Sequence, residues 1–352
     1  MKIGIDISQI VYKGTGVARF TEGLVKAICQ FDKKNEWVFF FSALRQSLDP
    51  SIEKLIASKK WKLIKMKIPP KALSVIWNDL HVLKIETILG KLDWFISSDW
   101  TEPPANCKKA TVVHDLVYLR YPKTVDNLVL KTQTKRLAWV KKESSLILAD
   151  SETTKNDLLE LLQIENKKIK VNYPGIENVK TNRKPNQKNP FILTVGKIEP
   201  RKNIGRLIEA FEKWNPKNID LLIVGPEGWD QKVKSSPKIK WLGYVPDDKL
   251  RSLYSSCLFF IYPSIWEGFG YPILEAMSFG AAVATSNTSS LKEIGKGATL
   301  LFDPFKVNSI EEALKEMTTN NKLRGELARK GINRAKEFTW KKYYDVMINA
   351  LW

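Results

Sequence analysis

The sequence predicts an α/β protein with two domains, each built on a parallel β-sheet. Short apolar runs typical of buried strands alternate with amphipathic helical patterns, and this alternation favours parallel sheets connected by helices. A length of 352 residues suits two domains of ordinary size. The composition, with 43% hydrophobic and 27% charged residues, is that of a globular protein and excludes a largely disordered chain.

The first half of the chain contains a run of candidate strands and one clear helix. Apolar residues at positions 17, 20, 24, 28 and 31 recur every three or four residues, which predicts a helix over residues 17–31. The predicted strands cover residues 1–7, 37–41, 61–68, 94–97, 110–114 and 146–149. We therefore expect a parallel sheet in this half.

The second half shows the same alternation. Strands are predicted at residues 191–195, 220–224, 239–242, 258–262 and 282–285. A helix is predicted to follow Asn203, which suits the N-cap position, and residues 340–352 show an aromatic-rich helical pattern. The segment 177–190 is polar, contains two prolines and has no periodicity, so we interpret it as the interdomain linker.

The chain is strongly basic, with a net charge of +19, and anionic partners are therefore expected. Residues 54–71 contain seven lysines interleaved with apolar residues. This pattern suggests a face that docks on an anionic membrane surface, although a solvated lysine-rich face explains it equally well. Three widely spaced cysteines in apolar contexts fit buried thiols in a reducing cytoplasm.

The most informative motif is E-G-F-G-Y-P-I-L-E, which runs from Glu267 to Glu275. Pro272 suits the first turn of a short helix that ends before Gly280. The N-terminus of such a helix attracts an anion, and either carboxylate can accept hydrogen bonds from sugar hydroxyls. The motif therefore indicates a cradle for a nucleotide linked to a sugar, while a strand-to-helix turn with two solvated glutamates explains the same residues.

The centre of this motif is an aromatic residue between two glycines. Gly268 and Gly270 flank Phe269, and a backbone without side chains can approach a ligand closely. We therefore expect these three residues to contribute to the same cradle.

A second motif, F-I-L-T-V-G-K-I-E-P-R-K-N, lies upstream at residues 191–203. Gly196 ends the apolar run, and Arg201 and Lys202 follow just before the predicted helix. Ligands of open α/β sheets bind outside the carboxyl ends of the strands. Two adjacent cations at that edge suit a diphosphate, with the guanidinium binding bidentately and the ammonium acting as a point charge. Two ordinary surface cations are the alternative.

Together the two motifs resemble the retaining glycosyltransferases of family 4. The resemblance rests on E-x-F-G-x4-E, with Y-P-S at residues 262–264 before it, A-M-x-x-G at 276–280 after it, and G-K-I-E-P-R-K-N upstream. Further similar stretches lie at residues 3–6, 14–19, 112–116, 150–151 and 173–176, so the resemblance covers nearly the whole chain.

The resemblance implies the GT-B fold, in which two Rossmann-like domains face each other across a cleft and the last helix crosses back to the first domain. It implies an N-terminal acceptor-binding domain of residues 1–178, joined by the C-terminal helix 337–352. Residues 179–336 would then form the domain that binds the nucleotide-sugar donor.

The segment Gly14-Thr15-Gly16 imitates a dinucleotide-binding fingerprint but departs from it. Arg19 stands where the third glycine belongs, and the loop begins several residues after its strand, so we reject a dehydrogenase. A glycine loop that opens a helix still offers backbone N–H groups to an anion. By resemblance it faces the donor diphosphate or the acceptor, and a simple helix-initiating turn is the alternative.

His114 ends a predicted strand and is followed by Asp115, which places both at the ligand-binding edge of a sheet. A lone histidine is more often structural, but the resemblance implies contact with the donor sugar or the acceptor near the reacting carbon. Asp115 would orient the histidine or cap the next segment. Trp100 is expected to belong to an aromatic rim that binds the acceptor.

The resemblance also implies which residues bind and react. The expected catalytic residues are His114, Glu267, Arg201 and Lys202. The expected donor-binding residues are Gly14, Thr15, Gly16, Gly196, Arg201, Lys202, Tyr244, Glu267, Gly268, Phe269, Gly270 and Glu275. The expected acceptor-binding residues are Asp115 and Trp100.

Transfer is expected to retain the configuration of the anomeric carbon without a metal. No D-x-D motif occurs, which agrees with a site in which Arg201, Lys202 and helix N-termini offset the phosphate charge, so no metal and no cofactor are expected. No carboxylate pair with the geometry of a retaining glycosidase is recognisable. We therefore expect front-face substitution, in which the leaving diphosphate accepts the proton of the acceptor hydroxyl.

The expected function is transfer of a hexose, most like mannose from GDP-mannose, to a saccharide or lipid-linked saccharide in polysaccharide or glycolipid biosynthesis. A UDP- or dTDP-sugar remains open, so the nucleotide product is GDP or UDP; a sugar phosphorylase or nucleotide-sugar epimerase of the same shape is an alternative. A basic nucleic-acid-binding protein is a remote alternative, because the charge is dispersed and no nucleic-acid-binding module is recognisable. We expect a cytoplasmic enzyme, peripheral at the inner membrane leaflet if residues 54–71 dock there.

Overall fold

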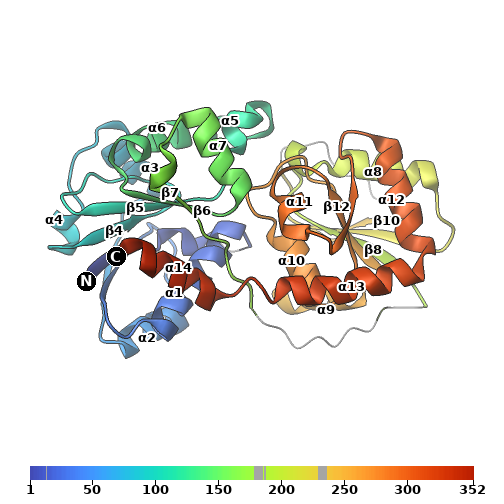
Figure 1. Cartoon of the computed structure of the whole chain (residues 1–352), viewed down its shortest axis with the longest axis horizontal. Helices are drawn as coiled ribbons and strands as arrows, with labels where there is room; N and C mark the ends of the chain where they lie inside the picture. Colours follow the sequence, from blue (N-terminus) through green and yellow to red (C-terminus); the bar gives the residue numbers. More distant parts are fainter. Residues whose placement is uncertain (13, 178–184, 186–187, 229–235) are drawn as a thin grey trace. The chain divides into compact units, whose positions relative to one another are not determined.

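The computed structural model describes residues 1–12, 14–177, 185, 188–228 and 236–352, and the chain divides into two compact units. Unit 1 consists of Met1–Pro122, Asp126–Gly175 and Thr339–Trp352, and unit 2 of Lys123–Val125 and Ile176–Phe338. Both chain termini lie in unit 1 (Figure 1). The linker predicted at residues 177–190 lies largely outside the described residues.

Unit 1 is built on a seven-stranded sheet in the order β3-β2-β1-β4-β5-β6-β7, and every neighbouring pair is parallel. Its strands are β1 (Lys2–Asp6), β2 (Glu36–Ser42), β3 (Lys62–Met66), β4 (Trp94–Ser97), β5 (Lys108–Val113), β6 (Leu146–Ala149) and β7 (Ile169–Val171). Apolar side chains such as Val38, Phe40 and Phe95 fill its core together with the buried Trp77.

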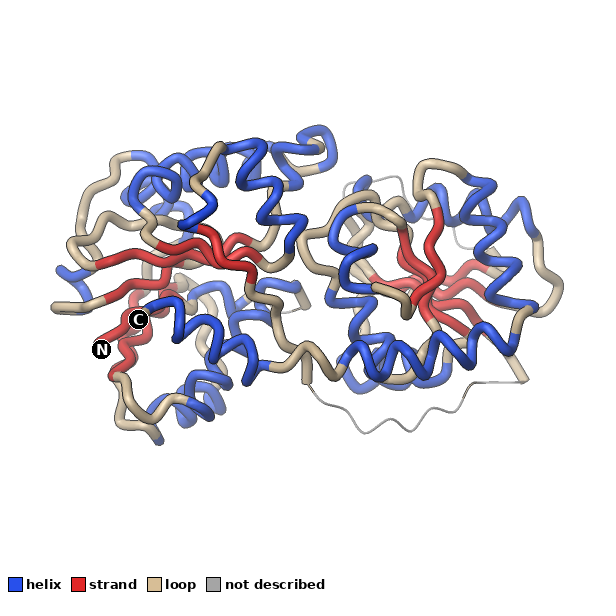
Figure 2. The backbone as a smooth tube through the Cα atoms, in the orientation of Figure 1, coloured by secondary structure: helices blue, strands red, loops and turns tan. Residues whose placement is uncertain are grey.

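Helices connect the strands of unit 1 and cover both faces of the sheet (Figure 2). The α-helices are α1 (Gly16–Phe31), α2 (Pro50–Ser58), α3 (Pro70–Ser74), α4 (Glu86–Leu89), α5 (Val117–Arg120), α6 (Asn127–Glu143), α7 (Glu152–Leu162) and α14 (Trp340–Leu351). Shorter turns are η1 (Ser8–Val11), the π-helical η2 (Val75–Asp79), η3 (Pro122–Thr124), which reaches into the part assigned to unit 2, and η4 (Asn166–Lys168).

Unit 2 repeats this architecture with six parallel strands in the order β10-β9-β8-β11-β12-β13. The strands are β8 (Phe191–Val195), β9 (Asp220–Val224), β10 (Ile239–Trp241), β11 (Phe259–Tyr262), β12 (Val283–Ser286) and β13 (Thr299–Phe302). The helices are η5 (Pro200–Lys202), α8 (Ile204–Trp214), α9 (Asp247–Ser256), α10 (Tyr271–Ser278), α11 (Ser289–Gly295), α12 (Val307–Thr319) and α13 (Asn321–Ala335). The fold class predicted from the sequence, two Rossmann-like parallel-sheet domains, is thereby confirmed.

The strand order reverses direction at one point in each sheet. In unit 2 the chain runs outward from β8 to β9 and β10, and then returns to place β11 on the other side of β8. The connections after β8 and after β11 therefore leave the same edge in opposite directions, and such a switch point is where open α/β sheets bind ligands. In unit 1 the corresponding point lies between β1 and β4.

Several strand predictions hold to the residue, and two strands were missed. The strands at 94–97, 146–149, 191–195 and 220–224 have the predicted bounds, and the others shift by one or two residues at an end. The missed strands, β7 and β13, have three and four residues, and neither is fully buried. An apolar run that short and partly exposed gives little signal, because pairing with a neighbouring strand decides its conformation.

Asn203 precedes α8 as predicted, but it does not cap that helix with its side chain. Its backbone is left-handed, with φ of 59°, and no side-chain capping bond forms. The side-chain amide instead donates to the carbonyls of Pro263 at 3.1 Å and Pro304 at 2.8 Å. The residue therefore joins the loops that follow β8, β11 and β13, which the sequence pattern did not indicate.

The lysine-rich segment 54–71 spans α2, β3 and the start of α3, and its apolar residues face inward. Ile56 is fully buried, and Ile64, Met66 and Ile68 pack against the core of unit 1. Most lysines of the run are exposed to solvent. Within the described residues, no helix combines the length and apolar character that a membrane crossing requires.

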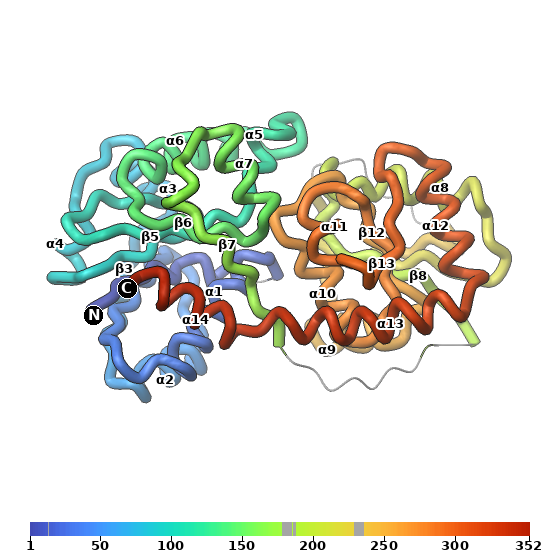
Figure 3. Tube along the Cα trace, in the orientation of Figure 1, coloured from blue at the N-terminus to red at the C-terminus, as the bar shows by residue number. Residues whose placement is uncertain are grey.

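The last helix, α14, packs beside α1 in unit 1, as the predicted fold requires (Figure 3). Trp340 and Tyr343 of α14 lie against the ring of Phe20 at centroid distances of 5.7 and 5.3 Å. This close approach depends on Gly23 of α1, because a Cβ atom there would lie 2.0 Å from Cζ2 of Trp340. The aromatic residues of α14 are therefore part of the unit 1 core.

We predict that Gly23→Ala destabilises the protein by about 1–3 kcal/mol, because overpacking forces the rigid indole of Trp340 away from α1. Gly325→Ala in α13 is the matched control, since no atom lies within 4 Å of a Cβ built there and alanine favours a helix. Urea unfolding followed by circular dichroism compares the two variants. A Gly23→Ala protein as stable as Gly325→Ala would contradict this account of α14 docking.

Candidate active site

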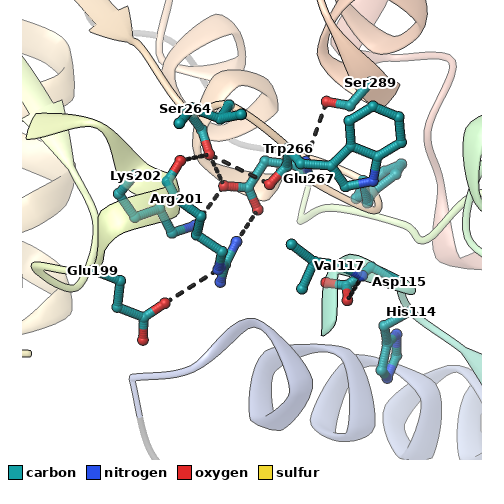
Figure 4. A network of polar contacts seen from close by, with 12 residues as sticks. His114, Asp115, Val117, Glu199, Arg201, Lys202, Ser264, Trp266, Glu267 and Ser289 are labelled. Carbon is teal, nitrogen blue, oxygen red and sulfur yellow. Dashed lines mark hydrogen bonds and ion pairs between the residues drawn. The ribbon is translucent and has the colours of Figure 1, made fainter. Parts of the chain in front are cut away.

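The candidate residues of unit 2 gather around the buried carboxylate of Glu267 (Figure 4). Oε1 of Glu267 accepts a hydrogen bond from Nζ of Lys202 at 2.6 Å, and Oε2 accepts one from Nη1 of Arg201 at 2.9 Å. Glu267 and Lys202 are exposed by only 7% and 9%, so each charge needs the other. Removing one partner of such a buried pair leaves an uncompensated charge at a high energetic cost.

The order of the strands brings these three residues together. Arg201 and Lys202 form η5 in the connection that follows β8, and Glu267 lies in the connection that follows β11. Because β8 and β11 are neighbours at the switch point, the two connections meet at the carboxyl edge of the sheet. The carbonyl of Arg201 accepts bonds from the backbone N–H of Ile265 at 2.8 Å and from Oγ of Ser264 at 3.0 Å.

Hydroxyl groups complete the surroundings of the Glu267 carboxylate. Oε1 also accepts bonds from the hydroxyls of Tyr262 at 2.9 Å and Ser264 at 2.5 Å. The backbone N–H of Glu267 donates to Oγ of Ser289, at the start of α11, at 3.1 Å. The carboxylate therefore accepts bonds from two cations and two hydroxyls, and it orients the two cations in turn.

The pKa values in this cluster reflect both burial and neighbouring charge. Burial by itself would raise the pKa of Glu267, but Arg201 and Lys202 outweigh burial and hold that pKa at about 2. Burial and the nearby Arg201 lower the pKa of Lys202, while Glu267 opposes that shift. Glu199 supplies a second carboxylate, whose Oε2 accepts a bond from Nε of Arg201 at 3.1 Å. Two cations and two carboxylates are thus in contact here.

The second glutamate of the motif lies on α10. The helix has the predicted form, with a proline in its first turn and Gly280 just beyond its end at φ of 76°. Glu275 accepts a hydrogen bond at Oε2 from the hydroxyl of Tyr254 at 3.0 Å. Gly270 precedes α10 with φ of 104°, a conformation that glycine adopts readily, so the turn that begins this helix depends on it.

The side chain of Phe269 belongs to the core of unit 2. It is 5% exposed, and its ring packs against Tyr271 and Phe338 at centroid distances of 5.1 and 5.8 Å. Only the backbone of this residue is left to contact a ligand, as expected for its neighbour Gly268. The conformation around Phe269 is held by Ser290, whose hydroxyl donates to the carbonyl of Phe269 at 2.9 Å.

Two other predicted donor residues follow strands of the same sheet. Gly196 directly follows β8, and a Cβ atom there would be in ordinary contact with the stem of Lys202, at 3.5 Å. Tyr244 lies after β10 and is 63% exposed, next to Gly243 with φ of 65°. Both therefore lie in connections that leave the carboxyl edge of the unit 2 sheet.

In unit 1, His114 forms a tight pair with Asp150. Nδ1 of His114 and Oδ2 of Asp150 are 2.6 Å apart. The register explains the contact, because Val113 of β5 pairs with Ala149 of β6 and the next residue of each strand follows in step. Phe20 packs edge-on against the imidazole at a centroid distance of 4.7 Å. Asp150 therefore fixes the orientation of the ring.

The His114–Asp150 pair favours a protonated imidazole. Burial alone would lower the pKa of His114, but Asp150, with help from Asp99 and Asp115, raises it to about 9. Burial raises the pKa of Asp150 to about 6, although His114 opposes this. At neutral pH the pair is thus a carboxylate with an imidazolium, and the imidazolium is a hydrogen-bond donor.

The remaining predicted residues of unit 1 have separate local roles. Thr15 is the N-cap of α1, its hydroxyl oxygen accepts from the N–H of Ala18 at 3.2 Å, and Gly14 precedes it with φ of 82°. Gly16 is the first residue of that helix. Asp115 accepts from the N–H of Val117 at 3.1 Å, so it caps the segment after His114.

Trp100 lies in the connection that follows β4. Its carbonyl accepts a bond from the side-chain amide of Asn78 at 3.0 Å. The indole Nε1 of Trp100 is buried and has no hydrogen-bond partner among the described residues. A ligand that accepts a hydrogen bond would satisfy it.

Sequence reasoning did not assign roles to several residues that the structure places in these clusters. Tyr262, Ser264 and Glu199 surround the unit 2 cations, and Asp150 pairs with His114. All of them lie at the end of, or in the connection after, a buried strand, and this position was a usable signal for polar residues. What the sequence did not provide was the order of the strands.

The chemistry available differs between the two units. In unit 2, a half-buried guanidinium and a buried ammonium are held by the same carboxylate in the connections after β8 and β11, an arrangement that suits a phosphate group. In unit 1, a charged imidazole suits a neutral hydroxyl or a developing negative charge. Among the residues that the structure describes, no group of three His, Cys, Asp or Glu side chains is arranged to hold a metal ion.

Comparison with known proteins agrees with this geometry. Residues 175–337 match the family described as "Glycosyl transferases group 1". The chain is 27% identical to O-antigen chain mannosyltransferase B of Escherichia coli, and the match covers 99% of both proteins. It is 33% identical to the serotype-specific mannosyltransferase WbdA of Escherichia coli over 43% of this chain and 20% of that protein.

A solved structure confirms the fold. Sucrose-phosphate synthase from Thermosynechococcus elongatus superimposes with a TM-score of 0.77 at 15% identity, covering 99% of this chain and 98% of that one. The chain thus carries a glycosyl transferases group 1 domain in unit 2 and is a hexose-transferring glycosyltransferase with the GT-B fold.

Proposed function

We propose that this glycosyltransferase moves mannose from GDP-mannose to a saccharide or lipid-linked saccharide acceptor, with retention at the anomeric carbon. The observation that carries the proposal is the pair of adjacent cations, the half-buried Arg201 and the buried Lys202, which Glu267 orients at the carboxyl edge of the sheet, where a diphosphate would bind. The likeness to O-antigen chain mannosyltransferase B over 99% of both chains supports mannose as the sugar. A UDP- or dTDP-linked sugar is the alternative donor.

The leaving diphosphate is the centre of the proposed mechanism. The bond between the anomeric carbon and the β-phosphate oxygen breaks, and the acceptor oxygen bonds to the same face of that carbon. The acceptor hydroxyl gives its proton to the departing phosphate oxygen. Arg201 and Lys202 stabilise the negative charge that develops on the diphosphate, and such preorganised donors contribute most where charge appears.

Glu267 acts in this proposal by positioning the two cations. Its Oε1 already accepts from Lys202, Tyr262 and Ser264, and its Oε2 accepts from Arg201. With a pKa of about 2 it remains a carboxylate at every working pH. In this proposal, sugar hydroxyls donate to those lone pairs of Glu267 and Glu275 that are not already occupied by protein donors.

The imidazolium of His114 provides a charged donor in unit 1. Because Asp150 raises its pKa to about 9, it is a poor general base at neutral pH and a strong hydrogen-bond donor. We assign it to an oxygen of the transferred sugar or of the acceptor. Asp150 is a positioning residue that keeps the imidazole charged and oriented.

The acceptor and the cellular location complete the proposal. The acceptor belongs to unit 1, where the indole N–H of Trp100 lacks a partner among the described residues. The enzyme works in the cytoplasm and meets lipid-linked acceptors at the inner leaflet of the membrane. The O-antigen function of its full-length relative supports this role in polysaccharide assembly.

Nucleotide binding tests the donor. We predict that GDP, at a hundred times its dissociation constant, stabilises the protein by about 2.7 kcal/mol and raises its melting temperature by roughly several degrees. UDP, dTDP and ADP under the same conditions, all without added metal, serve as comparisons in a thermal unfolding assay. A shift with UDP alone would replace GDP-mannose by a UDP-sugar, and no shift with any nucleotide would contradict the donor site.

Replacing Lys202 tests the phosphate role. We predict that Lys202→Ala lowers turnover by roughly 10²–10³-fold, the range seen when one preorganised donor is removed. Lys202→Arg keeps the charge and should recover part of the loss. Lys240→Ala is the matched control, since Lys240 is an exposed lysine of the same unit, paired with Asp220. Steady-state kinetics of the four proteins, each checked for its melting temperature, gives the comparison.

An unchanged turnover of folded Lys202→Ala would contradict the role of Lys202. A loss of turnover that follows a collapse of the melting temperature would instead show that the residue only stabilises unit 2. The Lys202→Arg variant distinguishes a role in catalysis from a role in stability, because arginine keeps the ion pair with Glu267.

The pH dependence tests the state of His114. We predict that kcat/KM falls as the pH rises through about 9, because the donating imidazolium loses its proton there. Asp150→Asn removes the carboxylate that raises this pKa, so burial then dominates and the falling limb moves to lower pH. Proton NMR follows the imidazole directly, since the chain has only two histidines and His114→Gln assigns the signal.

The same pair also contributes to stability. The folded pKa of His114 is raised, from 6.5 to about 9, so its stabilising effect is complete below pH 6.5 and is lost as the pH rises through 9. The pKa of Asp150 is also raised, so its ionisation between about pH 4 and 6 works against folding. If kcat/KM of wild type and of Asp150→Asn fell at the same pH, the result would contradict the assigned effect of Asp150 on the pKa of His114.

A further inference from the structure

Residues 75–83 of unit 1, which we call the hook, present a row of exposed aliphatic side chains. The exposed fractions are 48% for Val75, 63% for Leu80, 52% for Val82 and 42% for Leu83. The π-helical turn η2 brings them together, because the N–H of Leu80 donates to the carbonyl of Val75 at 2.9 Å and that of Val82 to Ile76 at 3.1 Å. Four large apolar side chains are thus gathered on one short segment.

Hydrogen bonds and ring stacking attach the hook to the rest of unit 1. The fully buried Trp77 donates its indole N–H to the carbonyl of Leu83 at 3.1 Å, and Trp139 of α6 donates to the carbonyl of Asn78 at 2.9 Å. His81 stacks on Trp139 with 3.5 Å between ring centroids and lies 2.9 Å from Glu143. These anchors hold the exposed residues in one arrangement.

The backbone of the hook is left-handed at two residues that are not glycine. His81 and Leu83 have φ of 51° and 63°, in the left-handed region that bulky side chains seldom adopt. Such strain persists only where surrounding contacts impose it, and it gathers at functional sites. A turn built only to connect η2 with α4 would not need it.

Lysines border the hook. Lys131, Lys135 and Lys142 of α6 are spaced by four and seven residues, so they share one side of that helix, and all three are exposed. Lys135 pairs with Asp79 of the hook, and Lys142 lies 5.0 Å above the ring of Trp139. Lys71 lies one helical turn before Val75, and Lys84 follows Leu83. The turn η2, which follows α3, contacts α6, so the hook and this helix are neighbours.

From this combination we infer that the hook and the α6 lysines form a docking surface for an anionic phospholipid bilayer. Aliphatic side chains enter the boundary between headgroups and acyl chains, while lysines remain at the level of the anionic headgroups. Each cation near such a surface adds to the affinity. Apart from Lys71, which borders the hook, the docking surface is distinct from the lysine run 54–71, whose apolar residues face the core.

Other occupants fit this surface less well. Single-stranded nucleic acid would stack its bases on aromatic side chains, and the exposed apolar residues of the hook are all aliphatic. A second copy of the chain in a symmetric pair would bring the lysine stripe close to its own equivalent, and like charges would repel. The inference rests on the proposed encounter with lipid-linked acceptors at the inner leaflet, and it is independent of the donor and of the chemistry of transfer.

Flotation of the full chain tests the inference. Vesicles of phosphatidylcholine alone are compared with vesicles that also contain phosphatidylglycerol, and we expect binding to the anionic vesicles. Leu80→Ser with Val82→Ser, and separately Lys131→Ala with Lys142→Ala, should each lower the partition coefficient by about tenfold or more. These side chains are exposed, so melting temperatures should stay unchanged.

Two matched controls locate the surface. Leu301→Ser removes an exposed leucine of unit 2, and Lys54→Ala with Lys62→Ala removes two exposed lysines of the 54–71 run; both should bind as wild type. Equal binding of the hook variant and wild type would overturn the inference, as would a loss confined to the Lys54 and Lys62 variant. A concentration-dependent dimer that Leu80→Ser abolishes would also overturn it in favour of self-association.

Discussion

The buried carboxylate of Glu267 is the constraint on which the site in unit 2 depends. It lies where two connections leave neighbouring strands, and neither Lys202 nor Glu267 could be buried there without the other. The pair therefore joins the connection after β8 to the connection after β11 and fixes the direction of Arg201 as well. The two cations would repel each other without this carboxylate, so it sets their arrangement within unit 2.

In unit 1, a histidine and an aspartate form a pair at the carboxyl edge of the sheet. His114 and Asp150 are the residues that directly follow two paired strands, and the register alone places them in contact. Here the carboxylate of Asp150 raises the pKa of the imidazole, whereas in unit 2 the carboxylate of Glu267 orients Arg201 and opposes the lowering of the Lys202 pKa by burial. In both units a buried acid thus orients a cationic group at the carboxyl edge of the sheet, which is the usual task of residues that support a reactive site.

Packing elsewhere in unit 1 determines the positions of individual side chains. The last helix returns to this unit and packs its aromatic residues around Phe20, which in turn contacts the imidazole of His114. On another part of the same unit, the buried Trp77 and the half-buried Trp139 hold a segment that exposes aliphatic residues to solvent. Packing that stabilises the core thus also determines what the surface presents.

The sequence by itself determined the fold class, most strands and the connections that carry the site, because buried parallel strands are continuous apolar runs and motifs such as E-G-F-G-Y-P-I-L-E have a fixed spacing. Only the tertiary structure decided which connections meet. The pairing of Glu267 with Arg201 and Lys202 follows from the adjacency of β8 and β11, and the burial of Phe269 and the role of Asn203 follow from neighbours distant in sequence. Strand order and side-chain direction arise from these long-range contacts, which local residue patterns do not encode.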